Sequence, residues 1–429
     1  MKTTKLVLSL IVIFQSLIGF SQDYYLHCGS ILDVQTGKEM KKATIIVKNN
    51  KISSISEGYI TKGQEKDVEI DLKNKFILPG LIDLHVHIES EQSPNRYASK
   101  FINNEADVAF EAARYAETTL MSGFTTVRDL GGTGVNVSLR NAINKGIAKG
   151  PRIFTAGKSI ASTGGHADPT NGSNQKLMGD PGPREGVVNS PEDGVKAVRQ
   201  RYKDGADVIK ITATGGVLSV AKNGKNPQFS IEEIKSITTT AKDYNMLTAA
   251  HAHGDEGMQR AIIGGIKTIE HGTFMSEATM ELMKKYDAYL VPTISAGKEV
   301  AMMAEVPGFY PDIVVPKAKE VGPQIQSTFS KAYKKGVKIA FGTDAGVFDH
   351  GKNAKEFGYM VEAGMPALAA IQSATTTNSM LLGLVNEIGQ IKTNFFADII
   401  AVDNNPLEDI KTLENVRFVM KNGVVYKNL

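Results

Sequence analysis

The chain has 429 residues, of which 41% are hydrophobic and 22% are charged. This composition supplies ample apolar material for a large core, which excludes a disordered or low-complexity chain. The 49 basic and 46 acidic residues leave a net charge of +3, so no electrostatic signal indicates binding to nucleic acid or to an anionic membrane.

The N-terminal segment is typical of an export signal. Lys2 and Lys5 precede a mostly apolar run over residues 6–20, which has the length of a signal-peptide core and is too short to span a bilayer. We expect residues 1–21 to be a signal peptide that is cleaved before Gln22. The mature protein is then exported, to the periplasm or beyond, without stable membrane insertion. An uncleaved membrane anchor is the alternative.

Both ends of the mature chain have the pattern of short strands joined by turns. The predicted hairpin strands are residues 44–47 and 51–55 near the N-terminus, and 416–420 and 424–426 near the C-terminus. We predict that residues 22–76 and 386–429 build one small β-sandwich domain, although the two ends could form separate sheets. The single cysteine, Cys28, allows no intrachain disulfide and excludes a cysteine-rich zinc site.

Residues 77–385 alternate short apolar runs with amphipathic stretches of helix length, a rhythm that indicates βα units. Eight strands are predicted, at residues 77–87, 124–130, 152–156, 208–213, 247–253, 268–271, 289–294 and 338–344. Helices are predicted between most of them, such as 107–121, 231–244 and 257–264. The count predicts a (β/α)₈ TIM barrel. An open doubly wound sheet is the alternative, but the first strand ends in His-Val-His and not in a glycine-rich phosphate loop.

Most of the eight histidines follow the C-terminal ends of predicted strands, where a barrel builds its active site. His85 and His87 are two residues apart in a strand and therefore share a face, so they could chelate one metal ion. His251 and His271 end the fifth and sixth strands. Each histidine taken alone could instead be a packed or surface residue.

Two further polar residues are unusual for their positions. Lys210 lies inside the apolar run Val-Ile-Lys-Ile, where an unpaired ammonium is costly, so the amine should be neutral, paired or modified. Addition of CO₂ would turn it into a carbamate able to bridge two metal ions, whereas a lysine that reaches the barrel rim is the simpler alternative. Asp344 ends the eighth strand and would need a cation or donors to stay ionised, unless it is a turn residue.

Five motifs in this order resemble the amidohydrolase superfamily of metal-dependent hydrolases. They are Leu-Ile-Asp-Leu-His-Val-His at residues 81–87, Gly-Ala-Asp-Val-Ile-Lys at 205–210, Ala-His-Ala-His-Gly at 250–254, Ile-Glu-His-Gly at 269–272 and Phe-Gly-Thr-Asp at 341–344. The match continues into the flanking segments at residues 78–80 and 397–399, and so covers nearly all of the mature chain.

The resemblance implies a role for each matching position. His85 and His87 would bind the more buried of two divalent ions, for which zinc is expected, and His251 and His271 the more exposed one. Lys210, as N6-carboxylysine, would bridge the two ions. Asp344 would bind metal and act catalytically as the proton shuttle for a metal-bridging hydroxide that attacks the substrate carbonyl. His253 departs from this pattern and is assigned to substrate binding, with the reverse assignment of His251 and His253 left open.

The segment Thr-Gly-Gly-His at residues 163–166 resembles a subgroup that contains Xaa-Pro and other dipeptidases, and whose members also hydrolyse N-acyl amino acids and aromatic amide toxins. We therefore expect a small-molecule substrate, a dipeptide or an N-acyl amino acid, with His166 and His253 near its carboxylate. The alternatives are a cyclic amide hydrolase of the imidazolonepropionase type, a lactonase, and a catalytically silent scaffold. A homo-oligomer is possible.

Two further expectations concern side chains outside the proposed metal site. Arg128 and Asp129, which end the second strand, are expected to pair with each other and support the barrel mouth, and His350 is expected to face solvent.

Overall fold

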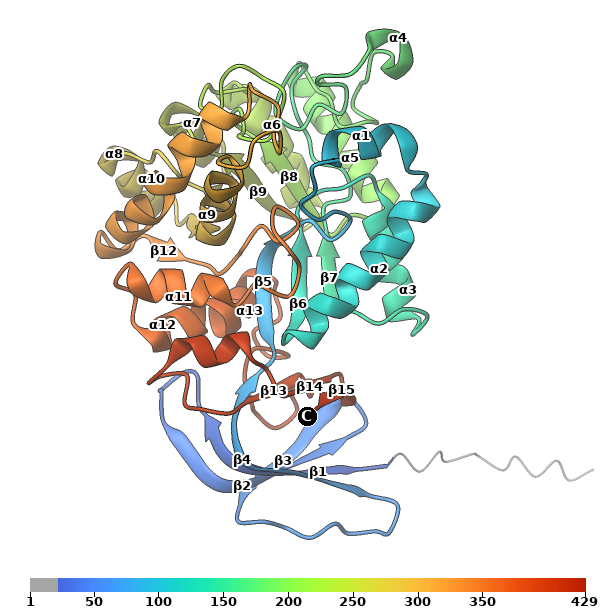
Figure 1. Cartoon of the computed structure of the whole chain (residues 1–429), viewed down its shortest axis with the longest axis vertical. Helices are drawn as coiled ribbons and strands as arrows, with labels where there is room; N and C mark the ends of the chain where they lie inside the picture. Colours follow the sequence, from blue (N-terminus) through green and yellow to red (C-terminus); the bar gives the residue numbers. More distant parts are fainter. Residues whose placement is uncertain (1–21) are drawn as a thin grey trace, which may run out of the picture.

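The computed structural model of the chain describes residues 22–429, so the predicted signal peptide and its cleavage site lie outside the described residues. Among the helices of the described part, none is long and apolar enough to cross a membrane. A β/α barrel stands above a smaller sheet domain, and the chain passes from one to the other between β4 and β5 (Figure 1).

The smaller domain is one seven-stranded mixed sheet with the strand order β15-β14-β13-β4-β1-β2-β3. Its strands are β1 (Tyr24–Leu32), β2 (Glu39–Lys48), β3 (Lys51–Glu57), β4 (Val68–Pro79), β13 (Ile399–Val402), β14 (Phe418–Lys421) and β15 (Val424–Asn428). Both predicted hairpins are present as antiparallel pairs, β2 with β3 and β14 with β15. Because β13 pairs directly with β4, both ends of the chain share one sheet, and the alternative of two separate sheets is wrong.

This sheet curls around its own hydrophobic core. Residues Leu26, Ile45, Ile70, Ile399 and Phe418 come from five strands and belong to one buried cluster. The start of β3 contacts the C-terminal segment, where the Ile52 amide donates to the Phe395 carbonyl over 2.9 Å. Members of this cluster alternate along their strands, as Leu26 and Cys28 or Ile399 and Ala401 do, because successive side chains point to opposite faces of a sheet.

The eight predicted barrel strands all correspond to strands of the structure. They are β5 (Leu81–Val86), β6 (Phe124–Asp129), β7 (Arg152–Thr155), β8 (Val208–Thr212), β9 (Leu247–Ala252), β10 (Thr268–His271), β11 (Tyr289–Val291) and β12 (Lys338–Ile339). They form two parallel runs, β5-β6-β7 and β8-β9-β10-β11-β12.

Backbone hydrogen bonds join these two runs at both seams. At one seam the Ile160 amide donates to the Lys210 carbonyl of β8 over 2.8 Å. At the other the Leu84 amide of β5 donates to Phe341, and the Asp344 amide donates to His85. The chain therefore has the closed parallel barrel expected from the strand count.

Helices surround the barrel on its outside (Figure 1). Their bounds are α1 (Arg96–Ile102), α2 (Glu105–Met121), α3 (Val135–Asn144), α4 (Gln175–Met178), α5 (Pro191–Asp204), α6 (Ile231–Asp243), α7 (Asp255–Ile263), α8 (Glu277–Lys285), α9 (Ile294–Met303), α10 (Val315–Lys334), α11 (Lys355–Glu362), α12 (Ala367–Gln372), η1 (Ser373–Thr377), α13 (Asn378–Leu381) and η2 (Ile410–Glu414). Helix α6 shows why they form where predicted: Ser230 and Glu233 make a capping box, and Ile234 and Ile237 lie buried at helical spacing.

The last two barrel strands are shorter than predicted. The predictions at 289–294 and 338–344 become β11, which ends at Val291, and β12, which ends at Ile339. Thr293, two residues after β11, has a φ angle of 52°, and this left-handed backbone turns the chain out of the extended direction. A strand pattern in the sequence does not reveal such a turn.

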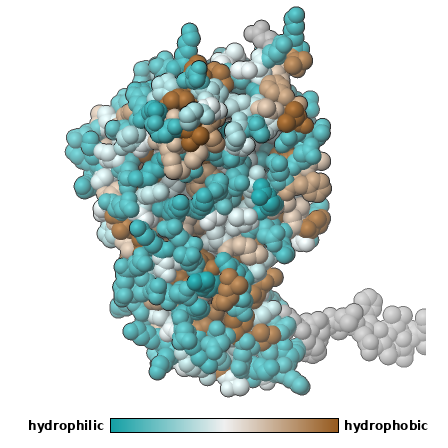
Figure 2. Space-filling view, viewed as in Figure 1, coloured by the Kyte–Doolittle hydropathy of each residue, from teal (hydrophilic) through white to brown (hydrophobic). Residues whose placement is uncertain are grey.

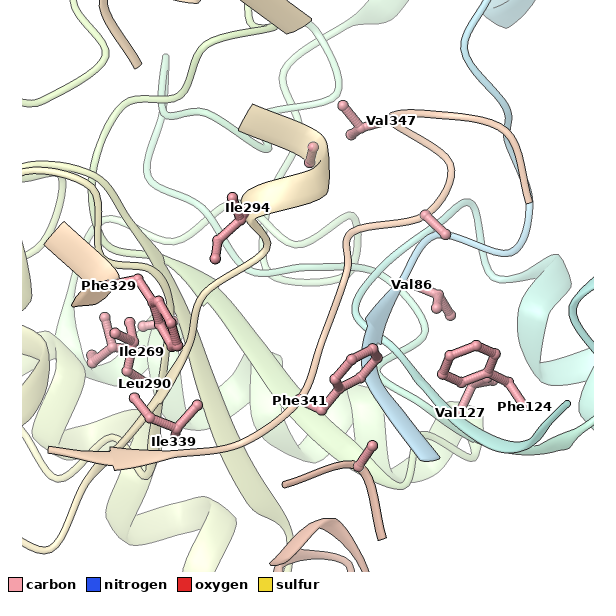
Figure 3. Packing of buried hydrophobic residues seen from close by; sticks show 14 of the residues in the cluster. Val86, Phe124, Val127, Ile269, Leu290, Ile294, Phe329, Ile339, Phe341 and Val347 are labelled. Atoms are coloured by element: carbon pink, nitrogen blue, oxygen red, sulfur yellow. The ribbon is translucent and has the colours of Figure 1, made fainter. Parts of the chain in front are cut away.

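Aromatic side chains fill the space between the barrel strands and the helices. Figure 3 shows Phe341, from the segment after β12, beside β5 and facing Phe124. The ring centroid of Phe341 lies 5.7 Å from that of Phe124 and 4.3 Å from that of Phe357. Outside, the face shown in Figure 2 is mostly hydrophilic with separate apolar patches. The strands that carry the site thus rest on a packed core.

Candidate metal centre and active site

One cavity of about 250 Å³ opens at the C-terminal ends of the barrel strands. All eight residues singled out from the sequence line it: His85, His87, His166, Lys210, His251, His253, His271 and Asp344. They come from segments up to about 260 residues apart in the chain, and the parallel barrel brings them together because it aligns its strand ends.

The two histidines of β5 each have one nitrogen engaged and one free. His87 Nδ1 donates to the Gly131 carbonyl over 2.7 Å, and His85 Nδ1 lies 2.9 Å from a Glu270 carboxylate oxygen. Both contacts engage Nδ1, which leaves the Nε2 lone pairs for a ligand. These Nε2 atoms lie 3.5 and 3.4 Å from Asp344 Oδ1. Both His85 Nε2 and Asp344 Oδ1 are buried without any hydrogen-bond partner.

The histidines of β9 and β10 form a second cluster. The ligand atoms of His251, His253 and His271 all lie within 4.8 Å of one another. His251 Nε2 donates to the Gly215 carbonyl over 3.0 Å, and His271 Nδ1 lies 2.7 Å from Thr293 Oγ1, so each ring again keeps one nitrogen free. Because His253 shares this cluster, the geometry leaves open which histidine of the β9 pair is the ligand.

Lys210 lies among these rings and is only 3% exposed. Within residues 22–429 its amine donates no hydrogen bond, and burial lowers its pKa to about 8. Burial also lowers the pKa of His87 and of His253 to about 3, and that of His251 and His271 far below the usual range. The imidazoles are therefore neutral at pH 7, which is the form that binds metal ions.

Three residues beside the cavity have strained backbones. His271, Thr293 and Asp344 have φ angles of 72°, 52° and 63°, in a region that residues other than glycine rarely adopt. Thr293 is β-branched, which makes the cost higher still. Such strain persists only where the surroundings enforce it, and it gathers at functional sites.

Two loops that follow β7 and β8 reach the cavity. The loop over residues 159–191 brings His166 against His251, with stacked ring centroids 4.3 Å apart. Gly216, in the loop after β8, permits this approach, because a Cβ there would lie 2.2 Å from His166 Cε1 and Nδ1. His166 Nδ1 is buried without a partner, which leaves it available to a ligand.

A buried ion pair behind His85 was not anticipated. Glu270 accepts hydrogen bonds from Arg128 over 2.9 Å and from Thr268 over 2.5 Å, and its other oxygen faces His85. The expected Arg128–Asp129 pair is wrong, since successive strand residues point to opposite faces. Asp129 instead accepts from backbone amides and from Asn136. The sequence feature that could have indicated this pair is the presence of two charged residues, Arg128 and Glu270, inside otherwise apolar strand segments.

The expectation that His350 faces solvent is also wrong. Its side chain is 4% exposed and stacks on Tyr115 with ring centroids 5.0 Å apart. His350 Nε2 donates to the Ser90 carbonyl over 2.9 Å, while Nδ1 lies 3.3 Å from Thr119 Oγ1. This histidine therefore links the loop after β12 to α2 and does not line the cavity.

The residues present fit a divalent metal site. Neutral imidazoles and a carboxylate are the donors that zinc and related ions prefer. Two groups of three have their ligand atoms within 4.8 Å of one another, namely His251, His253 and His271, and His85, His271 and Asp344. The His85–Glu270 contact has the form in which proteins orient a metal-binding histidine through its second nitrogen.

Comparison with known proteins agrees with this geometry. The model of the amidohydrolase family matches residues 76–426. The ochratoxinase of Aspergillus niger is 32% identical over 409 residues, with 91% of this chain and 84% of that protein covered. A crystal structure of a Xaa-Pro dipeptidase with bound methionine in the active site is 52% identical, with a TM-score of 0.91 over 95% of this chain and 100% of that one.

A prolidase complexed with N-methylphosphonate-L-proline is 30% identical, with a TM-score of 0.87 and coverage of 95% of this chain and 100% of that one. The family match includes the barrel segments that contain the histidines, Lys210 and Asp344. The ochratoxinase and the Xaa-Pro dipeptidase structure each align with more than nine-tenths of this chain. This protein therefore belongs to the amidohydrolase family and is a hydrolase that acts on amide bonds.

Proposed function

We propose that the protein is a binuclear metal-dependent amidohydrolase that cleaves the amide bond of a dipeptide or an N-acyl amino acid. The observation that carries this proposal is the convergence of six histidines, Lys210 and Asp344 on one cavity, with the ligand atoms of His85 and Asp344 buried and unpaired. The dipeptidase and prolidase structures that this chain resembles support the substrate class.

His85 and His87 would hold one ion and His251 and His271 the other, with Asp344 on the first. Lys210 would bridge the two as its carbamate, since an amine without a hydrogen-bonding partner, buried among metal ligands, becomes an anionic ligand by adding CO₂. Divalent ions held there would polarise the scissile carbonyl and lower the pKa of a water molecule.

The protein's own groups then position and transfer protons. Asp344 Oδ1 lies 3.5 Å from His85 Nε2 and 3.4 Å from His87 Nε2, where it can take a proton from the attacking water and deliver it to the departing amine nitrogen. His166 and His253 line the same cavity and would contact the substrate. Apolar side chains such as Val300 and Ile325 also line the cavity, which suits a small substrate with an apolar side chain.

The test combines metal analysis with a substrate panel. Wild type and Lys210→Ala are assayed for metal content and for hydrolysis of dipeptides, N-acyl amino acids, a cyclic amide and a lactone. We expect two metal equivalents in wild type, fewer in the variant, and amino acid release only from the first two substrate classes. Full metal content and full rate in Lys210→Ala would refute the bridging role, and turnover of the cyclic amide or lactone alone would refute the substrate class.

A further inference from the structure

The cavity contains a cation that forms no ion pair or hydrogen bond with any group among the described residues. Arg96, the first residue of α1, lines the cavity together with the histidines. Its NH1 is buried without a hydrogen-bond partner. Among residues 22–429, no carboxylate forms an ion pair with it and no acceptor bonds its guanidinium.

Arginines elsewhere in the fold whose side chains are buried or half-buried have partners, whereas Arg96, itself half-buried, has none among residues 22–429. Arg128 donates to Leu84, Thr268 and Glu270. Arg152 pairs with Asp398 over 2.7 Å, and Arg140 pairs with Asp207 over 2.6 Å. Buried charges in proteins are normally paired, because desolvating a charge without compensation is costly. An exception at the wall of an active-site cavity indicates that the partner is a ligand.

The position of Arg96 fits a substrate group close to the reacting bond. Arg96 lines the same cavity as His85, His87 and Asp344, so its guanidinium and the carboxylate proposed to transfer the proton border one space. A second unpaired donor, the buried Nε2 of Gln92, lies four residues earlier in the same segment. The Gln92 side chain is held from the other side by the Tyr310 hydroxyl over 3.1 Å.

We propose that Arg96 is the specificity residue that binds the free α-carboxylate of the substrate, so that the enzyme requires a carboxylate next to the scissile amide. This inference rests on the proposed function and narrows it. A guanidinium matches a carboxylate with two parallel hydrogen bonds, which gives both attraction and orientation. In a dipeptide or an N-acyl amino acid the carboxylate is separated from the scissile nitrogen by one carbon, so fixing it also fixes the bond to be cleaved.

The experiment uses the metal-loaded full chain and two substrates that differ only in the proposed contact. These are alanyl-methionine and alanyl-methioninol, in which a hydroxymethyl group replaces the carboxylate. Wild type is compared with Arg96→Met, Arg96→Lys and the control Arg199→Met, which removes an exposed arginine from α5. Binding of free methionine is measured by calorimetry on the same proteins.

We expect wild type to prefer the carboxylate substrate and Arg96→Met to lose about 10- to 100-fold in kcat/KM for it, as for a hydrogen bond to a charged group. The same variant should keep its rate on alanyl-methioninol and bind methionine about 10- to 100-fold more weakly. Arg96→Lys should fall between, and Arg199→Met should match wild type. Thermal unfolding of Arg96→Met should equal or exceed that of wild type, because Arg96 bonds no group of the fold.

Failure of the inference differs from failure of the proposed function. If wild type cleaves alanyl-methionine but Arg96→Met loses equally on both substrates, the carboxylate contact is refuted while the dipeptidase activity stands. If wild type cleaves neither of these substrates nor any dipeptide or N-acyl amino acid of the panel, the proposed function fails, and calorimetry decides the role of Arg96. If wild type binds methionine and Arg96→Met binds it much more weakly, the carboxylate site is supported. If wild type does not bind methionine, or if both proteins bind it equally, the carboxylate site is refuted.

Discussion

The buried pair of Arg128 and Glu270 links the stability of the barrel to the metal site, and Glu270→Gln separates these two roles. Both side chains are 0% exposed. The Glu270 carboxylate accepts from Arg128 and Thr268 on one oxygen and faces His85 Nδ1 on the other. The substitution keeps the shape of the side chain, removes its charge and leaves the Arg128 charge buried without a partner.

Removing one partner of a buried ion pair costs about 3–5 kcal/mol. Glutamine keeps one acceptor oxygen, so we expect the lower end, about 3 kcal/mol, in the free energy of unfolding. Loss of the partner that orients a metal-binding histidine weakens metal affinity by about 10- to 100-fold. Urea unfolding is measured on chelator-treated protein, so that the lost metal affinity does not contribute to the stability difference.

Two further variants of the chain serve as controls for this test. Glu117→Gln makes the same chemical change in an exposed pair with Lys149, where the expected cost is below about 1 kcal/mol. The double variant Arg128→Met with Glu270→Met should be less destabilised than the sum of the two single variants, because no charge is left unpaired. Its zinc affinity should nevertheless stay low, since His85 still lacks its acceptor. The reasoning would be refuted if the double variant lost as much free energy of unfolding as the two single variants together and still bound zinc as tightly as wild type.

Three other predictions follow from the same structure. Burial raises the pKa of Glu356 from its ordinary value of 4.5 to about 7. The folded protein therefore binds more protons than the unfolded chain between these values, and this group makes the free energy of unfolding fall as pH rises from about 4.5 to 7. Glu356→Gln should remove that part of the pH dependence in urea unfolding curves, and curves that stay parallel to wild type would contradict it. Gly216→Ala should displace the His166 ring and raise KM about tenfold with a smaller change in kcat, measured on the best panel substrate; an unchanged KM would show that His166 does not contact the substrate. Dialysis against a strong chelator should abolish hydrolysis, and added zinc, manganese or cobalt should restore it, whereas full activity in metal-free protein would exclude a metal mechanism.

The fold class and the residues of the cavity could be predicted because both depend on patterns that are local in the sequence. An apolar run that ends in a polar residue identifies a barrel strand and its C-terminal end, as at His85, His251 and His271. Repetition of that pattern along the chain then places these residues at one rim, since parallel strands in a barrel end on the same side. The prediction needed no knowledge of which side chains touch.

Contacts between side chains were decided by the tertiary structure. The sequence places Arg128 beside Asp129, but the pleat of β6 turns them to opposite faces, and Glu270, 142 residues further along, becomes the partner of Arg128. His350 looked exposed in a polar loop and is buried against Tyr115 of α2. Arg96 has an ordinary sequence context, and only the folded chain shows that its charge is left unpaired at the cavity. Partners that lie far apart in the chain are set by how strands and helices pack, and a one-dimensional pattern carries no record of that packing.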